Sequence, residues 1–270
     1  TLGISEFIIG VTVVAFGTSI PEVGTSFYSA LIGHPEIAFG NVIGSNVANI
    51  ALVLGTAAFF GTFSMKKKDV GDLPMLIVSM VLTVAVAIDL KITIIEGIIL
   101  LIFYAVYLYR IIKNNEEKIR SKSHNIKPQT FLLLFLSVVF IYFGAKFSID
   151  GAIDIAAIFG ISESVIGFTL VALSTSLPEL ATSVIAVYKK KLGISIGNII
   201  GSNIFNSLVV LGVASMATTL TLNISTLMFQ VPAMMLLTAF LAWRIRDLKI
   251  SKYEGAALVV IYILILVKLF

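Results

Sequence analysis

The chain carries the sequence GTSIPE at residues 17–22, inside a long apolar run, and a near copy, STSLPE, at residues 174–179. Proline cannot donate to the carbonyl four residues earlier, so each stretch predicts a broken helix with unpaired backbone oxygens beside a glutamate. Thr18 and Ser19 precede Glu22 by four and three residues, which would place both hydroxyls near its carboxylate. An ionised side chain deep in an apolar span is costly and indicates a functional site. The pattern therefore predicts a cluster of oxygen ligands that occurs twice.

The composition indicates an integral membrane protein. Hydrophobic residues make up 58% of the 270 positions and charged residues 13%, with a mean hydropathy of +1.05. A soluble domain has roughly 25% charged residues. Apolar runs of about 20 residues recur, which is the length that an α-helix needs to cross a bilayer. The absence of cysteine excludes disulfide frameworks, iron–sulfur clusters and thiolate zinc sites. We therefore expect an all-α integral membrane fold.

Apolar runs bounded by polar residues, glycine or proline predict nine transmembrane helices. They are Ile4–Ile32, Glu36–Phe63, Val70–Ile88, Ile92–Ile112, Gln129–Ile149, Ile155–Tyr188, Ile194–Thr218, Ser225–Trp243 and Tyr253–Phe270. A long polar stretch, Arg110–Lys127, separates the fourth from the fifth. The chain thus divides into a first repeat at residues 1–112, a linker at 113–128 and a second repeat at 129–270.

The two repeats are related by sequence. An ungapped alignment at an offset of 157 residues matches residues 3–55 with residues 160–212, and about half of the positions are identical. A second shared block reads GNVIGSN at 40–46 and GNIIGSN at 197–203. Repeated glycines could serve close helix packing, whereas repeated Glu, Asn, Ser and Thr indicate a shared polar site.

Charge placement predicts the orientation. The lysines and arginines other than Lys91, Lys146 and Lys268 fall in four clusters, which nine spans would place on one side. The clusters are Lys66–Lys68, Arg110–Lys127, Lys189–Lys191 and Arg244–Lys252. The positive-inside rule assigns that side to the cytoplasm. The loops expected outside are Gly33–Pro35, Asp89–Lys91, Asp150–Asp154 and Thr219–Asn223.

Under this assignment the helices that carry Glu22 and Glu179 run in opposite directions, as an inverted repeat requires. Such a repeat needs an odd number of helices per unit. The second repeat has one span, Gln129–Ile149, ahead of its signature, whereas the first repeat shows none. We therefore expect ten helices in the full protein and a first repeat that lacks its first helix in this chain.

These residues resemble a known family. The segments GTSIPEVGTS at 17–26 and GNVIGSNVANIALVLG at 40–55 pair with STSLPELATS at 174–183 and GNIIGSNIFNSLVVLG at 197–212. They are similar to the two α-repeats of the cation/Ca2+ exchanger superfamily, specifically its prokaryotic sodium/calcium exchanger branch. The resemblance covers nearly the whole chain. It implies an inverted-repeat secondary transporter whose second, third, seventh and eighth helices form the ion sites.

The resemblance also implies a set of metal ligands. Glu22 and Glu179 would be the shared calcium ligands, with the backbone carbonyls of Thr18 and Thr175 beside them. The flanking sodium sites and the centre would use Ser19, Ser45, Ser176, Ser202, the carbonyls of Ala15 and Ala172, Asn49 and Asn206. Asn206 departs from the branch, whose members carry an aspartate there, so the usual sodium stoichiometry does not transfer. Asn46 and Asn203 lie off this face and are expected to brace the helices.

The expected function is antiport of Ca2+ against Na+ by alternating access at a two-glutamate site near the middle of the membrane. Calcium takes six to eight oxygen ligands, and two glutamates neutralise it. When the site is empty, the two carboxylates repel, so Na+ or H+ must occupy it before it reorients. An H+/Ca2+ exchanger of the same fold and, from another class, a passive cation channel stay open. The expected partners are the lipid bilayer and inorganic cations, without a cofactor or nucleic acid, in the cell membrane with a cytoplasmic linker. An enzyme is not expected.

Overall fold

The computed structural model describes residues 5–270 except for 62, 65–71, 115–127 and 248, and without the side chains of 63, 64, 128–135 and 138. The lysines at 66–68 and nearly all of the predicted linker at 113–128 therefore lie outside the described residues. The start of the first predicted span, at Ile4, lies outside them as well.

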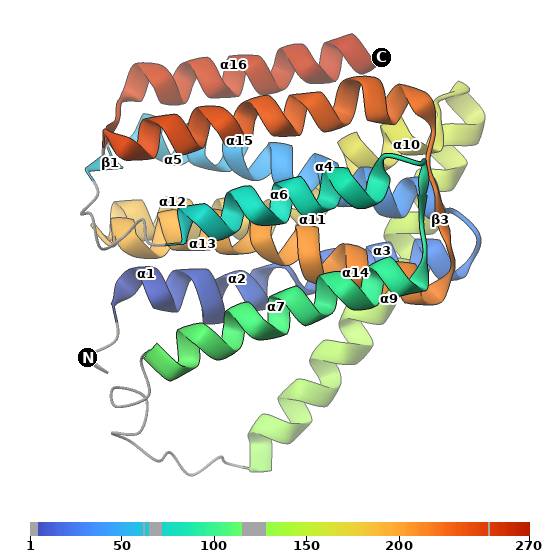
Figure 1. Ribbon diagram of the computed structural model, residues 1–270, viewed down its shortest axis with the longest axis horizontal. Helices are drawn as coiled ribbons and strands as arrows, with labels where there is room; N and C mark the ends of the chain where they lie inside the picture. Colours follow the sequence, from blue (N-terminus) through green and yellow to red (C-terminus); the bar gives the residue numbers. More distant parts are fainter. Residues whose placement is uncertain (1–4, 62, 65–71, 115–127, 248) are drawn as a thin grey trace.

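Each predicted apolar segment of the first repeat forms a helix or a run of joined helices (Figure 1). The elements are α1 (Glu6–Ile9), η1 (Gly10–Val14), α2 (Ala15–Thr18), α3 (Ile20–Leu31), α4 (Pro35–Ala48), η2 (Asn49–Leu54), α5 (Gly55–Phe60), α6 (Leu73–Ala87) and α7 (Ile94–Asn114). The η elements are short π-helical turns, which are common at functional sites.

The second repeat follows the same order after one additional long helix. The elements are α9 (Pro128–Phe159), α10 (Glu163–Ile166), η4 (Gly167–Val171), α11 (Ala172–Thr175), α12 (Leu177–Tyr188), α13 (Leu192–Phe205), η5 (Asn206–Val210), α14 (Leu211–Ala217), η6 (Thr226–Gln230), α15 (Val231–Arg246) and α16 (Lys252–Leu269). The π-helical turns η1 and η4 occupy equivalent positions in the two repeats, and so do η2 and η5.

The predicted outer loop at residues 150–154 is wrong, because α9 continues through it to Phe159. Aspartate alone does not stop a helix, and Lys146 Nζ lies 2.7 Å from Asp150 Oδ2 one turn later. The helix ends where Gly160 adopts a φ of +64°, a left-handed conformation that favours glycine. The segment predicted from Ile155 therefore starts as a new helix only at Glu163.

The all-α membrane fold is confirmed, and four two-residue strands form two antiparallel pairs in its loops. The strands are β1 (Phe63–Ser64) with β4 (Lys249–Ile250), and β2 (Lys91–Ile92) with β3 (Leu220–Thr221). The helix predicted to reach Phe63 ends at Phe60, since Gly61 takes an extended conformation that leads into β1. Each strand pair joins loops of the two repeats, and the two pairs lie at opposite ends of the bundle (Figure 1).

Several helices are long and apolar enough to cross a membrane. Within the described residues there are four such helices, or up to six when each bent pair is taken as one span. The four are Pro35–Phe60, Ile94–Asn114, Leu192–Ala217 and Thr226–Arg246. The bent pairs are Glu6–Thr18 with Ile20–Leu31 and Glu163–Thr175 with Leu177–Tyr188. The protein is thus a helical multi-pass membrane protein, and the count of nine spans stays a prediction.

The two repeats run in opposite directions. The run from α1 to α3 goes from left to right in Figure 1, and the run from α10 to α12 goes from right to left. The ends of α7, α12 and α15, which carry Arg110, Lys189 and Arg244, lie together at the left end. This shared end agrees with the one-sided clustering of basic residues that the sequence predicts.

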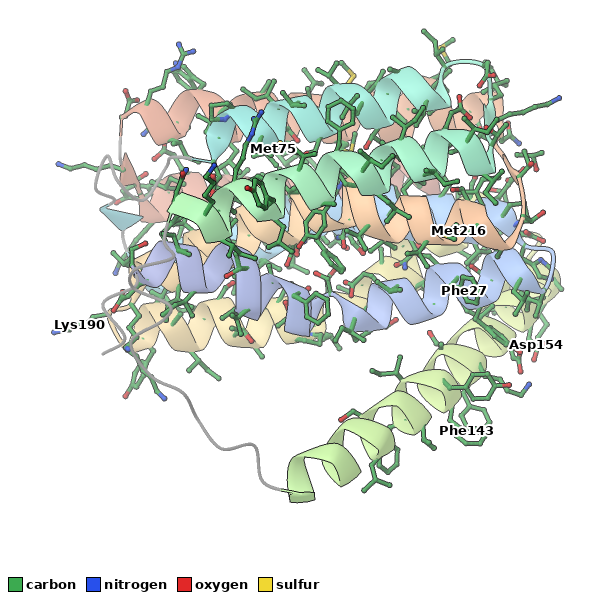
Figure 2. All side chains as sticks on the ribbon, turned by 60° about the horizontal axis from the view of Figure 1, so that its bottom comes forward. Phe27, Met75, Phe143, Asp154, Lys190 and Met216 are labelled. Atoms are coloured by element: carbon green, nitrogen blue, oxygen red, sulfur yellow. The ribbon has the colours of Figure 1, made fainter. Side chains whose placement is uncertain are left out.

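The core of the bundle is formed by the runs α4 to α5 and α13 to α14, whose most apolar windows are each 83% buried. Glycines allow the close approach of neighbouring backbones there. A Cβ atom at Gly40 would come within 2.6 Å of the carbonyl oxygen of Ser164, and one at Gly197 within 2.5 Å of that of Phe7. These equivalent contacts hold α4 against α10 and α13 against α1. The helix α9 packs beside α3 and slants away from the bundle (Figure 2).

Candidate functional site: two buried glutamates at paired helix breaks

The two signature segments form helices that break where the sequence predicts. The axis bends by 41° between α2 and α3 and by 43° between α11 and α12. Pro21 and Pro178 lie in the first turn of the second half, where a proline needs no N–H partner. Glu22 and Glu179 follow in the same first turns. Each carboxylate therefore lies at the positive end of a helix dipole, which favours a negative charge.

The breaks also alter the backbone hydrogen bonding. The bonds that join α2 to α3 run from Ser19 N to Ala15 O, at 3.0 Å, and from Val23 N to Ser19 O, at 3.3 Å. The equivalent bonds at the second break start from Ser176 N and Leu180 N. In the described backbone, no hydrogen bond across the break reaches the carbonyls of Gly17 and Thr18. The unpaired carbonyls that the sequence predicts therefore lie at Gly17 and Thr18, whereas the Ala15 carbonyl accepts a bond from Ser19 N.

Both glutamates are fully buried, with exposed fractions of 0%. They are the acidic members of the buried set in the described part of the chain, and that set contains no lysine or arginine. The described residues also contain no group of three or more His, Cys, Asp or Glu that could hold a metal ion. A cation here would be held by two carboxylates together with hydroxyl, amide and backbone oxygens, which suits a hard ion such as Ca2+ or Na+.

The hydroxyl of Ser19 binds the carboxylate of the opposite repeat. Ser19 Oγ donates to Glu179 Oε1 at 2.8 Å, and Ser202 Oγ donates to the same oxygen at 3.4 Å. The expectation that Ser19 faces Glu22 is therefore wrong. Ser19 lies at the break, with φ −91° and ψ 8°, so the three-residue helical spacing to Glu22 no longer sets the direction of its side chain.

The Glu22 carboxylate has a different environment. Neither of its oxygens has a hydrogen-bond partner among the described groups, and the same is true of Ser176 Oγ. Thr175 and Ser176 nevertheless lie beside it, and it is within electrostatic range of Glu179. The two glutamates therefore share one buried region, with side chains of the second break next to Glu22 and side chains of the first break next to Glu179.

Two buried asparagines connect the breaks to the neighbouring helices, and the sequence reasoning did not assign them a role. Asn41 accepts from Thr175 Oγ1 at 3.1 Å and donates to Ser26 Oγ at 2.9 Å. Its repeat equivalent, Asn198, accepts a hydrogen bond from Thr18 Oγ1 at 3.2 Å. The Nδ2 of Asn198 donates to Ser183 Oγ in α12. The sequence contains a signal for them, because each is the second residue of the repeated block that begins with Gly-Asn. Each holds a threonine of the opposite repeat at the break.

The remaining predicted residues lie on the same buried helices. Ser45 and Ser202 have exposed fractions of 0%, and Ser45 Oγ donates to the side chain of Asn41 at 3.4 Å. Asn49 and Asn206 are equally buried, and their side-chain amides have no hydrogen-bond partner among the described groups.

The bracing role expected of the neighbouring asparagines agrees with the contacts. Asn46 Nδ2 donates to Ser207 Oγ at 2.9 Å, and Asn203 Nδ2 donates to the carbonyl of Asn46 at 3.2 Å. Both bonds cross between the two central helices. These asparagines therefore join the two repeats to each other.

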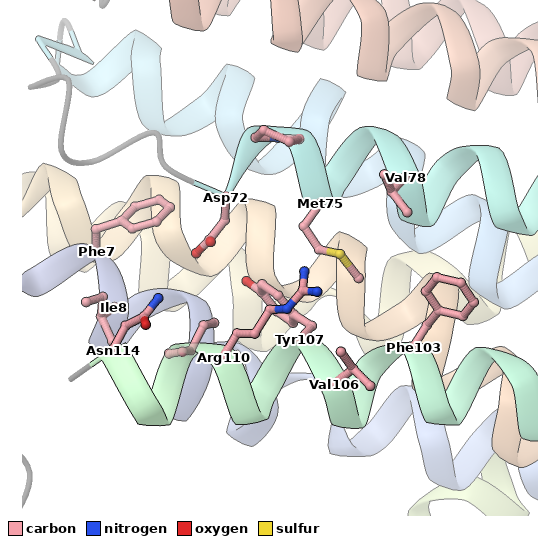
Figure 3. A pocket seen from close by; sticks show the side chains of 12 residues that line it. Phe7, Ile8, Asp72, Met75, Val78, Phe103, Val106, Tyr107, Arg110 and Asn114 are labelled. Carbon is pink, nitrogen blue, oxygen red and sulfur yellow. The ribbon is translucent and has the colours of Figure 1, made fainter. Parts of the chain in front are cut away.

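Two cavities lie near this core. One of about 390 Å³ touches both breaks and the slanted helix α9, with Pro21, Thr25, Thr175 and Pro178 among its lining residues. A larger one of about 560 Å³ lies between α1, α6 and α7, and Asp72, Tyr107 and Arg110 line it (Figure 3). Residues of both breaks line the smaller cavity, whereas Glu22 and Glu179 line neither of the two.

Comparison with known proteins agrees with this geometry. The family model for the sodium/calcium exchanger protein matches residues 1–113 and 129–270. The inner membrane protein YrbG of Escherichia coli K12 is 35% identical over 232 residues, which cover 81% of this chain and 71% of that protein. The sodium/calcium exchanger MaX1 of Methanosarcina acetivorans is 31% identical over an alignment of 318 residues, which covers 100% of this chain and 90% of that protein.

A solved structure gives the same result. The sodium-calcium exchanger NCX_Mj, soaked with 2.5 mM Na+ and 0.1 mM Ca2+, aligns with a TM-score of 0.71 and 34% identity. The alignment covers 100% of this chain and 88% of that chain. These matches confirm the resemblance to prokaryotic sodium/calcium exchangers, and they describe a membrane cation exchanger rather than an enzyme. The chain belongs to the sodium/calcium exchanger protein family.

Proposed function

We propose that this exchanger moves Ca2+ across the membrane in exchange for Na+, by alternating access to a site shared by Glu22 and Glu179. The observation that carries the proposal is the pair of fully buried carboxylates at two helix breaks, in a buried set without lysine or arginine. Two negative charges in so poorly solvated a place need cations to neutralise them. A divalent ion does so alone, and monovalent ions do so in larger number.

The proposed ligands are those that the signature positions suggest. Glu22, Glu179 and the carbonyls of Thr18 and Thr175 would bind Ca2+, and the Na+ sites would flank it. The other ligands are Ser19, Ser45, Ser176, Ser202, the carbonyls of Ala15 and Ala172, Asn49 and Asn206. The unpartnered amides of Asn49 and Asn206 support their inclusion, because buried amides without a partner are costly unless something fills the space beside them. The Ala15 carbonyl already has a hydrogen bond, but a carbonyl has two lone pairs and can still bind an ion.

The proposed coupling follows from the cost of an empty site. Without a cation, the two carboxylates repel each other where water does not screen them. The helices could then not pass between inward-facing and outward-facing arrangements at a useful rate. Na+ must enter after Ca2+ leaves, and this requirement makes the transport an exchange.

An H+/Ca2+ exchanger is the second candidate, and one residue favours it. Asn206 supplies an oxygen but no charge, so the core has two carboxylates rather than three. Two protons would neutralise such a site as well as two sodium ions. A passive channel is disfavoured, because the bonds between Ser19, Ser202 and Glu179 close the polar region across the two repeats.

We further propose the membrane arrangement that accompanies this function. The chain would form nine spans in the cell membrane, with the linker at 113–128 in the cytoplasm. Residues 1–112 and 129–270 would be its inverted repeats.

Flux measurements on reconstituted vesicles test the proposed function. We expect radioactive Ca2+ to accumulate when a Na+ gradient is imposed outward, and to remain outside when that gradient is collapsed. Accumulation driven only by a proton gradient would favour the second candidate. Uptake that follows the Ca2+ gradient alone, without a counter-ion, would identify a channel and overturn the proposal.

A further inference from the structure

Two ion pairs join the repeats away from the buried glutamates. At the start of α1, Glu6 Oε1 lies 4.0 Å from Lys191 Nζ, in the residue just before α13. At the start of α10, Glu163 Oε1 lies 2.8 Å from His34 Nδ1, in the residue just before α4. The helices α1 and α13 begin at one end of the bundle, and α10 and α4 begin at the other (Figure 1). The two pairs therefore lie at opposite ends of the molecule.

The two pairs are equivalent in the repeat. Glu163 follows Glu6 by 157 residues, and Lys191 follows His34 by the same 157 residues. Each pair joins the acidic start of one signature segment to the residue that precedes the next helix of the other repeat. The acid is the same in both pairs, whereas the base is histidine in one and lysine in the other. The inverted repeat has thus placed a titratable base at one end and a permanently charged base at the opposite end.

The surroundings of the histidine pair are simple in charge. Glu36, in the first turn of α4, is within electrostatic range of Glu163. The helix α9, which packs on α10, carries the pair Lys146 and Asp150 and a further aspartate, Asp154. The elements β3 and η6, which pack on α4, contain no titratable side chain. The charged groups on these elements are therefore mainly acidic.

The histidine pair is also the less exposed of the two. The side chains of His34 and Glu163 are 26% and 37% exposed, against 52% and 47% for Lys191 and Glu6. Charge attraction is less screened where water is partly excluded. Histidine changes charge between about pH 5 and about pH 8, whereas lysine does not. The attraction at this end is full while His34 is protonated and Glu163 ionised, and it falls as the pH rises and the imidazole loses its charge.

We propose that these four residues are positioning residues, which clamp α1 to α13 at one membrane face and α10 to α4 at the other. His34 makes the second clamp, defined by His34 and Glu163, sensitive to pH near neutrality. That clamp leads directly to the ion site, because α10 continues to the break at Thr175, and α4 carries Asn41 and Ser45. Loosening this clamp changes the position of Thr175 and Ser176, at the second break, relative to Glu22.

The first experiment measures thermal unfolding of the purified full chain between about pH 5 and about pH 8 for wild type, His34→Lys and His34→Gln. We expect the melting temperature of wild type to match that of His34→Lys at the acid end and to fall about 1–3 °C below it at the alkaline end. Relative to His34→Gln, wild type should be the more stable at the acid end only. Parallel curves for wild type and His34→Lys would overturn the proposal.

Two further variants guard against effects of misfolding. Glu163→Gln removes the acid, so adding it to His34→Lys and to wild type should abolish the pH-dependent difference between them. Lys191→His, at the equivalent position, should introduce a new but smaller pH dependence, because that pair is longer and more exposed. A Lys191→His curve parallel to wild type would contradict the equivalence of the two clamps.

The second experiment rests on the proposed function and measures Ca2+ exchange in oriented vesicles. The pH is varied on one face at a time. The ratio of the Ca2+ concentrations for half-maximal exchange in wild type and His34→Lys should change about two- to threefold with pH on the face of His34, and not on the other. A constant ratio would overturn the positioning role. If wild type exchanges no Ca2+ at all, the proposed function fails, while the unfolding curves still decide the clamp.

Discussion

Glu22 and Glu179 occupy equivalent positions in the two repeats, yet their environments differ. Glu179 accepts hydrogen bonds from Ser19, across the repeat boundary, and from Ser202. Glu22 accepts none among the described groups, although Ser176, the equivalent of Ser19, lies beside it. Equivalent residues are thus hydrogen-bonded to the carboxylate at Glu179 and not hydrogen-bonded to it at Glu22.

The largest expected effect comes from removing either charge. Glu22→Gln or Glu179→Gln leaves one negative charge against a divalent ion in a poorly solvated site, so Ca2+ binding and transport should be lost in both. Isothermal titration and vesicle flux measure the two losses. Glu96→Gln, at the start of α7, is a control outside the buried set. Retained Ca2+-dependent transport in either core variant would show that the two carboxylates do not share one ion.

The second-largest expected effect concerns the different hydrogen bonding of the two glutamates. Ser19→Ala removes a hydrogen bond to a buried carboxylate and should weaken Ca2+ binding about tenfold. Ser176→Ala removes no such bond in this arrangement and should weaken it about twofold or less. Titration of both variants under the same ionic conditions makes the comparison. Equal losses would mean that the two arrangements exchange freely and that the difference between the glutamates is not a resting preference.

A third test compares the two unpartnered amides. Asn206→Asp adds a third titratable group to the core, so the Na+ dependence of Ca2+ efflux should become steeper and its proton sensitivity greater. Asn49→Asp is the matched change in the first repeat. Efflux is measured against Na+ concentration and against pH in both variants and wild type. Superimposed curves for Asn206→Asp and wild type would show that residue 206 does not face the ion site.

The smallest expected effect lies at the surface turns that end the bent helices. Gly33 adopts φ +91° after α3, and the equivalent residue after α12, Lys190, adopts φ +58°. A left-handed conformation costs a residue with a side chain about 1 kcal/mol. Lys190→Gly should therefore raise the stability by about that amount, and Gly33→Ala should lower it similarly. Thermal unfolding of the two variants measures both shifts, and a destabilised Lys190→Gly would mean that the lysine side chain contributes more than its strained backbone costs.

Most of the architecture could be predicted from the sequence. The positions of the helix breaks follow from Pro21 and Pro178, and the order of helices follows from the apolar runs. The opposite directions of the repeats follow from the span count and the placement of the basic residues. The errors occurred where a local rule was applied without its neighbours. Asp150 and Asp154 predict a loop, but polar residues at the end of a span do not stop a helix until a residue such as Gly160 can turn the chain.

The sequence predicts which residue types make up the candidate site, but not which of them are hydrogen-bonded to each other. The set of Glu, Ser, Thr and Asn residues could be read from the duplicated signatures. Which hydroxyl meets which carboxylate could not, because a helix break changes the direction of every side chain after it. Asn41 and Asn198 were overlooked for a related reason, since their bonds to Thr175 and Thr18 cross between repeats that are far apart in sequence.

The sequence by itself therefore determined the membrane class, the duplication, the helix breaks and the two glutamates, because hydropathy, repetition and the missing N–H of proline act locally. The tertiary structure decided the pairing of Ser19 with Glu179, the unpaired state of Glu22 and the ion pairs of His34 and Lys191. These depend on how two antiparallel repeats pack through their glycines. Close packing at Gly40 and Gly197 sets distances that no linear pattern contains.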